Sequence, residues 1–242
     1  MKIKNIVTTL MLICLVTAIS CAKPKPKVLI FCKTAGFHHE SIAVGIPAII
    51  KLGKENNFDV DTTTNATKFT SDNLKQYAAV IFLSTTGDVL NAEQQTAFEQ
   101  YIKAGHGFVG VHAATDTEYD WPWYGNLVGA YFKSHPSKQQ EANLEIVDRN
   151  FIATKHLPAT WRRLDEWYNY KWIASDLHVL IKIDEKSYTG GENGDNHPMS
   201  WYHTYDGGRS FYTALGHTDA SYADPLYLKH LLGGILYAIG KK

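Results

Sequence analysis

An apolar strand that ends abruptly on a histidine constrains the fold of this chain more than any other feature. The strand, residues 108–111, runs into His112, and Gly110 and Ala113 flank its end. Small residues around a polar one are typical of the sharp strand-to-helix elbow on which α/β enzymes present a reactive side chain. Because imidazole titrates near neutrality, this elbow favours proton transfer or metal binding over acyl-enzyme chemistry. A histidine that only caps a helix or fills a polar core position is the alternative.

Apolar strands and amphipathic helices alternate in the first half of the chain. A polar loop, residues 34–41, separates the first expected strand from the first expected helix. Asn91 and Gln94 have the spacing of a capping box before a further helix, which Gly105 ends. The expected strands are 28–33, 58–63, 78–84 and 107–111, and the first expected helix is 41–57. This order predicts an α/β fold with a doubly wound, mostly parallel sheet covered by helices on both faces.

The second half of the chain changes character from about residue 140. Strands follow one another without long helices between them, and residues 206–208, Asp-Gly-Gly, have the composition of a hairpin turn. The expected strands are 143–147, 178–183, 200–204 and 210–215, followed by a closing helix over 225–239. We therefore expect antiparallel strands to extend the parallel sheet within a single domain, residues 28–242.

The beginning of the chain predicts export. Two lysines precede a short apolar stretch, residues 6–19, as in a signal peptide over residues 1–20. Cys21 stands where bacterial lipoproteins carry their acylated cysteine, and the Lys- and Pro-rich segment 21–27 predicts a stiff tether. We expect a lipoprotein anchored to a bacterial membrane, periplasmic or on the cell surface. The leaflet and the oligomeric state stay open.

Composition limits the partners of the chain. Its 24 basic and 24 acidic residues give a formal net charge of +0, so no field steers a nucleic acid towards it. Contact with a membrane is expected only through the lipid anchor. The 6 Trp, 14 Tyr and 11 His exceed what packing usually requires. Aromatic rings with polar tips are common in sugar-binding clefts, so a small carbohydrate is the expected partner.

Four histidines have unusual local settings. His135 and His197 each precede a proline, which holds them extended on loops of fixed direction. His217 follows an expected strand, as His112 does, and ligands of doubly wound sheets bind at the carboxyl ends of strands. We predict that all four face one cleft at that edge. Each taken alone is more often a surface or loop-capping residue.

Carboxylates and an arginine could complete such a site. Asp165 and Glu166 lie among aromatic residues that could raise a carboxyl pKa by desolvation, although a solvated acidic turn is the alternative. Asp116, four residues after His112, can share one side of the first turn beyond the elbow. Arg209 could orient a carboxylate or form a surface ion pair. No H-x-H, H-E-x-x-H or C-x-x-C spacing occurs, so no cofactor is expected, and a divalent metal such as zinc would need dispersed ligands.

Taken together, these motifs resemble those of the ThuA-like family, trehalose-utilisation proteins with a class I glutamine amidotransferase-like fold. The resemblance covers nearly the whole domain and rests on residues 37–41, 84–88, 107–114, 129–132, 135–136, 165–168, 197–201 and 208–217. Amidotransferases carry cysteine at the elbow where His112 stands, so the resemblance implies their fold and not glutamine hydrolysis. Members of the family are associated with sugar utilisation, often beside dehydrogenases that oxidise disaccharides to 3-keto sugars.

Two functions follow from these expectations. The first is an enzyme acting on a glycoside or 3-keto sugar, a lyase, hydrolase or isomerase, with His112 and His217 as base and enolate stabiliser in either order and Glu166 as acid. The second is a non-catalytic carbohydrate-binding lipoprotein, whose aromatic side chains stack on sugar faces. Turnover of a 3-keto-disaccharide distinguishes them. In both, the expected substrate contacts are His39, Asp116, His135, Tyr168, His197, Trp201 and Arg209.

Overall fold

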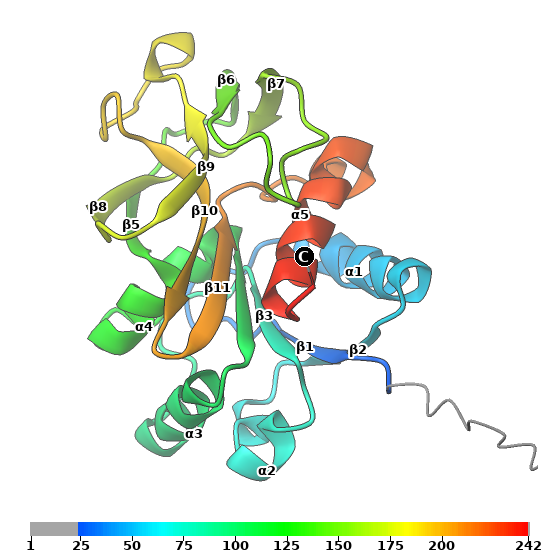
Figure 1. Ribbon diagram of the computed structural model, residues 1–242. Helices are drawn as coiled ribbons and strands as arrows, with labels where there is room; N and C mark the ends of the chain where they lie inside the picture. Colours follow the sequence, from blue (N-terminus) through cyan, green and yellow to red (C-terminus); the bar gives the residue numbers. More distant parts are fainter. Residues whose placement is uncertain (1–23, 242) are drawn as a thin grey trace, which may run out of the picture.

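A mixed sheet of nine strands forms the centre of the computed structural model, which describes residues 24–241 (Figure 1). The strand order is β2-β1-β3-β4-β11-β10-β9-β6-β7. Its first five strands run parallel, as predicted for a doubly wound α/β fold. They are β2 (Asp59–Thr63), β1 (Lys27–Phe31), β3 (Ala79–Leu83), β4 (Gly107–Val111) and β11 (Gly208–Thr213).

Antiparallel strands extend this sheet, which confirms the expectation for the second half of the chain. They are β10 (Pro198–Tyr205), β9 (His178–Ile183), β6 (Gln140–Ile146) and β7 (Thr160–Asp165). A separate two-stranded sheet pairs β5 (Ala130–Ser134) with β8 (Asn169–Ile173). The sequence pattern does not predict β5, β7 and β8, because polar residues interrupt their apolar side chains. In β7, exposed and buried residues alternate.

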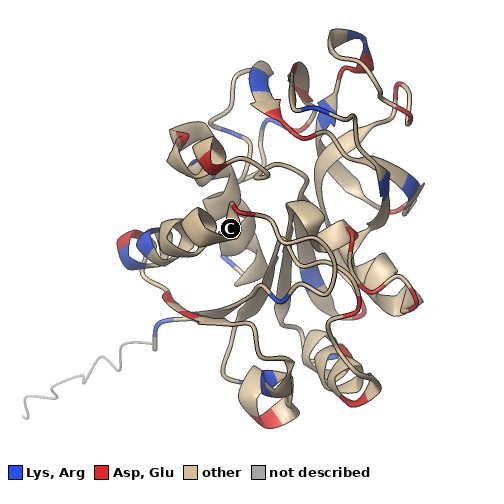
Figure 2. Ribbon diagram, turned by 180° about the vertical axis from the view of Figure 1, so that it is seen from behind, with Lys and Arg blue, Asp and Glu red and all other residues tan. Residues whose placement is uncertain are grey.

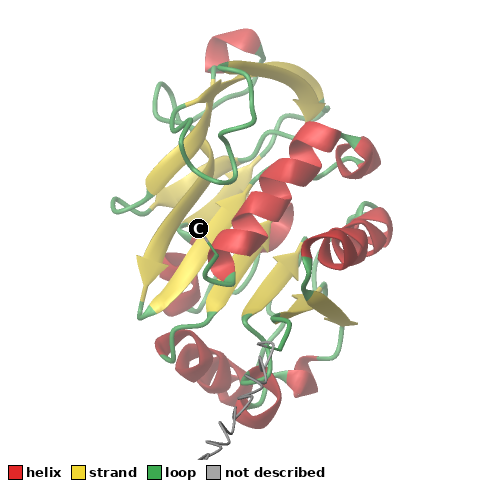
Figure 3. Ribbon diagram, turned by 45° about the vertical axis from the view of Figure 1, so that its right-hand side comes forward, coloured by secondary structure: helices red, strands yellow, loops and turns green. Residues whose placement is uncertain are grey.

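Helices cover both faces of the parallel half. α1 (Ile42–Asn56) and α5 (Pro225–Ala238) lie side by side in front of the sheet in Figure 3. α2 (Ser71–Leu74), α3 (Ala92–Lys103) and α4 (Pro122–Val128) lie behind it, and short 3₁₀ turns span Ala66–Lys68, His112–Thr115, Glu185–Ser187 and Asp219–Ala223. The predicted capping box is present, since Asn91 and Gln94 exchange side-chain and backbone hydrogen bonds of 3.0 Å. The expected hairpin turn is also present, with Asp206 and Gly207 at positive φ between β10 and β11.

Charge is spread over the described residues without separation by sign. Figure 2 shows basic and acidic residues interspersed along helices and loops. Within residues 24–241, no helix combines the length and the apolar character that crossing a membrane requires. The predicted signal peptide and Cys21 lie outside the described residues.

Candidate active site

His112 occupies a strained turn at the carboxyl end of β4. Its φ of 49° lies in the left-handed region, and a 3₁₀ turn follows at once. Gly110 must be small, because a Cβ there would approach the Tyr212 ring to 2.9 Å. The Tyr212 hydroxyl in turn donates to the His112 carbonyl oxygen at 2.7 Å. The elbow expected from the sequence is therefore present, with histidine at its apex.

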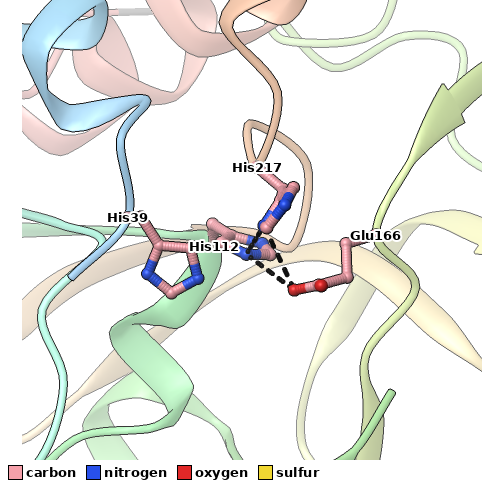
Figure 4. A group of neighbouring side chains, drawn as sticks. All are labelled: His39, His112, Glu166 and His217. Atoms are coloured by element: carbon pink, nitrogen blue, oxygen red, sulfur yellow. Dashed lines mark hydrogen bonds and ion pairs between the residues drawn. The ribbon is translucent and has the colours of Figure 1, made fainter. Parts of the chain in front are cut away.

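The imidazole of His112 is fixed in one orientation. It is fully buried, and its Nδ1 lies 2.8 Å from the carbonyl oxygen of Ala214. Because a carbonyl only accepts, Nδ1 carries a proton, and in the neutral imidazole Nε2 then has a lone pair. This Nε2 lies 3.1 Å from Nδ1 of His217 and 3.4 Å from Oε2 of Glu166 (Figure 4).

His217 and Glu166 form an ion pair over His112. Their Nδ1 and Oε2 atoms are 3.1 Å apart, and their side chains are 18% and 11% exposed, so this side of the cluster is accessible. Burial alone would raise the pKa of Glu166, but the adjacent imidazoles of His112 and His217 outweigh burial and hold the pKa well below its usual range. Burial alone would lower the pKa of His217, whereas the contact with Glu166 raises it. His217 lies in the loop beyond Thr213, the last residue of β11, and not directly at the strand end as expected.

His39 joins the cluster from the loop after β1. Its ring lies edge-on to those of His112 and His217, with centroid distances of 4.8 and 5.3 Å. Burial, followed by the proximity of these two histidines, lowers the pKa of His39 to about 3, so the ring is neutral. One donor atom from each of His39, His112, Glu166 and His217 lies within 4.8 Å of the other three. The sequence places His39 in a loop motif but gives no signal for this contact.

Tyr168, His135 and Asp116 surround the cluster. The Tyr168 ring packs on that of His112 with centroids 4.4 Å apart. His135 has a side chain 39% exposed, and its Nδ1 lies 3.4 Å from Oε1 of Glu166, on the accessible side. Asp116 follows the elbow and accepts a hydrogen bond of 2.6 Å from a neighbouring tyrosine hydroxyl, although burial still raises its pKa. His135 and the partly exposed Asp116 are available to contact a substrate, whereas Tyr168 is buried and supports the His112 ring instead of the expected sugar contact.

Three of the expected substrate contacts lie elsewhere. His197 is buried behind Tyr168 and donates from Nε2 to its carbonyl oxygen at 2.7 Å, because Pro198 begins β10 and directs this histidine inward. Trp201 is fully buried in the core, where its indole N–H donates to a backbone carbonyl. Arg209 lies at the amino end of β11, the opposite edge of the sheet, and donates to the last turn of α5. The structure thus corrects these three expectations, and it brings together His112, His135 and His217 without His197.

Asp165 and its neighbour Glu166 have different roles, although the sequence suggests a carboxylate pair. The buried carboxylate of Asp165 accepts the backbone N–H groups of Gly216 and His217 and a hydrogen bond from Arg163, each at 3.1 Å. Only Glu166 faces the cluster. Asp165 is therefore a positioning residue for the loop that carries His217. The i, i+2 spacing of Arg163 and Asp165, which puts both on one face of β7, is the sequence signal for their pairing.

A groove of about 970 Å³ lies away from this cluster, along β6, β7 and β9. Its lining includes Asn143, Glu145, Thr160, Lys182, Asp184 and Asp195. It contains none of the residues that the sequence singles out for chemistry. The histidine cluster is therefore the better candidate for the active site.

Comparison with known proteins identifies the family. The family model for ThuA, trehalose utilisation, matches residues 27–238. The chain belongs to this family. No curated protein matches it. The fold of this ThuA-family chain is similar to that of a ThuA-like protein from Bacteroides uniformis. The TM-score is 0.76 and the identity 24%, over 90% of this chain and 93% of that one.

Two further solved structures show the same fold. A ThuA-like protein from Parabacteroides merdae matches with a TM-score of 0.69 and 24% identity, over 90% of this chain and 91% of that one. A β-galactosidase from Bacillus circulans matches with a TM-score of 0.57 and 11% identity, over 89% of this chain and 30% of that one. At these identities the likeness establishes the fold alone.

Proposed function

We propose that this protein is an enzyme of sugar metabolism that acts on a glycoside or a 3-keto sugar. Membership of the trehalose-utilisation family supports a sugar-related role. The observation that carries the enzymatic part is one set of contacts, in which the lone pair of buried His112 meets the His217–Glu166 ion pair on an accessible side. Proton transfer requires an acid and a base arranged in this way, whereas binding of sugar hydroxyl groups does not.

The proposed chemistry is proton transfer beside a ketone. A carbonyl at C3 of a sugar acidifies the C2–H bond, so Nε2 of His112 takes that proton and the electron pair moves to the carbonyl oxygen as an enediolate. The enediolate then expels the glycosidic oxygen from C1, and this oxygen takes a proton and leaves as an alcohol. Addition of water to the resulting double bond, with hydroxyl at C1 and hydrogen at C2, completes a net hydrolysis.

The geometry favours one assignment of roles over the others. Nδ1 of His112 donates to Ala214, which leaves Nε2 as the base. Oε2 of Glu166 lies 3.1 Å from Nδ1 of His217, where it accepts a hydrogen bond and orients that imidazole beside Nε2 of His112. His217 is therefore a better proton donor than Glu166, the acid expected from the sequence.

Sugar binding without catalysis is the second candidate function. Phe37 is 67% exposed, and its ring lies beside that of His39 with centroids 4.9 Å apart. An exposed aromatic ring next to polar groups can stack on the apolar face of a sugar. Incubation of the purified protein with a 3-keto-disaccharide separates the two functions. Release of monosaccharides supports the enzyme, and binding without any product supports the sugar-binding protein.

A further inference from the structure

Three donor atoms of the histidine cluster converge on one point. Nδ1 of His217 lies 3.1 Å from Nε2 of His112 and 3.1 Å from Oε2 of Glu166, and the latter two atoms are 3.4 Å apart. Donor atoms that hold one zinc ion tetrahedrally, each about 2.0–2.1 Å from the metal, lie roughly 3.3 Å from one another. The triangle therefore already has nearly the size of one face of a metal coordination shell.

The point between these atoms requires a positive charge. His112 presents only a lone pair at Nε2, because its Nδ1–H donates to Ala214. The Glu166 carboxylate, 3.4 Å away, also presents only lone pairs. The single Nδ1–H of His217 cannot point fully at both acceptors. A divalent cation at this point satisfies all three side chains at once.

The three side chains of the triangle have the kind of hydrogen-bond partners that orient metal ligands in proteins. Metal-bound histidines commonly donate their other ring N–H to a backbone carbonyl, as His112 does here. The Asp165 carboxylate accepts the backbone N–H groups of both Glu166 and His217, at 3.0 and 3.1 Å. The His112 imidazole is thus fixed by Ala214, and the backbone that carries Glu166 and His217 is held by Asp165.

His39 lies at the remaining side of the site. Its side chain is buried; its Nε2 lies 3.5 Å from the Tyr168 hydroxyl, and in the described part of the chain its Nδ1 has no hydrogen-bond partner. Figure 4 shows the ring beside His112 with one nitrogen turned towards the other side chains. Its donor atom lies within 4.8 Å of the other three, so the ring is close enough to supply a fourth ligand. Because the four residues come from four separate segments, no spacing motif reveals them.

We infer that His112, His217 and Glu166, with His39 as the fourth side chain, bind one divalent transition-metal ion. Imidazoles with a single carboxylate suit Zn²⁺ and its neighbours in the first transition row, whereas Mg²⁺ and Ca²⁺ prefer oxygen ligands. This inference goes beyond the proposed function and does not depend on it. A metal ion and a transferable proton are alternative occupants of the same point.

Calorimetric titration with Zn²⁺ alone tests the inference, with protein that carries no histidine tag and has been freed of metal with a chelator. We expect one equivalent to bind. His217→Ala and Glu166→Gln should each weaken binding by more than about 100-fold, since even hydrogen-bond partners of metal ligands contribute about 10–100-fold. His178→Ala, at an exposed histidine of β9, is the matched control and should bind as the wild type does. Co²⁺ should give the intense visible absorption of a low-coordinate site in the wild type and the control only.

The outcomes are separable from those of the proposed function. Lack of stoichiometric Zn²⁺ binding by the wild type overturns the inference, as does unchanged binding in His217→Ala and Glu166→Gln. Both side chains are partly exposed, so circular dichroism should show native folding. Turnover of a keto sugar by protein that binds no Zn²⁺ would refute the metal site and leave the enzyme. Tight Zn²⁺ binding without turnover of any keto sugar would support the metal site and contradict the proposed enzyme.

Discussion

The buried carboxylate of Asp165 accepts the backbone N–H of His217 at 3.1 Å, and this contact connects the two halves of the sheet. Asp165 ends β7, the last strand of the antiparallel part, whereas His217 follows β11 of the parallel part. The same strand end carries Glu166 to His112 at the elbow. The antiparallel extension therefore supplies the carboxylate that contacts both His112 and His217.

Replacement of Asp165 by Ala should destabilise the protein by about 3–5 kcal/mol, because it leaves the buried Arg163 guanidinium without its main partner. Urea denaturation measures this loss. Asp224→Ala removes the other carboxylate near Arg163, which is more exposed and also caps α5, and should cost only about 1 kcal/mol. Equal losses in the two variants would contradict the role given to Asp165.

Replacement of His112 or His217 by Asn should lower turnover of a 3-keto-disaccharide by a factor on the order of 100 or more, as expected on removal of a general base or acid. Asn tolerates the left-handed backbone of His112, whose φ is 49°, so the fold should persist. Steady-state kinetics measures the loss. Binding of the unoxidised disaccharide should stay nearly unchanged. Full activity in both variants would show that neither imidazole transfers the proton.

Acid should destabilise the protein through His230, which is fully buried in α5. Burial lowers its pKa to about 3, against about 6.5 in the unfolded chain, so its neutral form stabilises the fold above pH 6.5. Its Nδ1–H donates to the Ala153 carbonyl oxygen, and Thr213 lies 3.2 Å from Nε2. His156 and Arg163 nearby further disfavour a charge.

As the pH falls from 6.5 towards about 3, His230 should therefore remove up to about 1.4 kcal/mol of stability per pH unit. Unfolding free energies of the wild type and His230→Gln, measured across this window, give the difference in slope. His178→Gln, at an exposed histidine, should keep the wild-type slope. Parallel curves for the wild type and His230→Gln would contradict the assignment.

We propose, from the pattern of residues 1–27 alone, that the protein is exported and anchored through an acylated Cys21. Cys21→Ser should then move it from the membrane fraction to the soluble fraction. Cell fractionation measures the change, with Cys32→Ser as the control that should stay in the membrane fraction. If the intact mass of the wild type shows no acyl groups at the mature N-terminus, the anchoring proposal is contradicted and simple secretion is favoured.

The sequence predicts the parallel half of the fold well, because each buried strand there is a continuous apolar run between turn signals, as in β3. It also identifies the elbow at His112, since local sterics decide that turn. It does not predict β7, and hence does not reveal why Glu166 reaches the site. Trp201, predicted as a sugar contact, is a core residue. The sequence cannot distinguish an aromatic residue that stacks on a sugar from one that fills the core. Contacts such as His39 with His217 depend on packing between distant segments, which no spacing rule describes.

Hydrolysis of a 3-keto-disaccharide in deuterated water tests the central claim most directly. If the base at the elbow removes the C2 proton, the released 3-keto monosaccharide should carry deuterium at C2, as NMR or mass spectrometry would show. His112→Asn should lose both the release and the label. Binding of the keto-disaccharide by the wild type, with neither release of monosaccharide nor incorporation of deuterium, would contradict the enzyme and favour the sugar-binding protein.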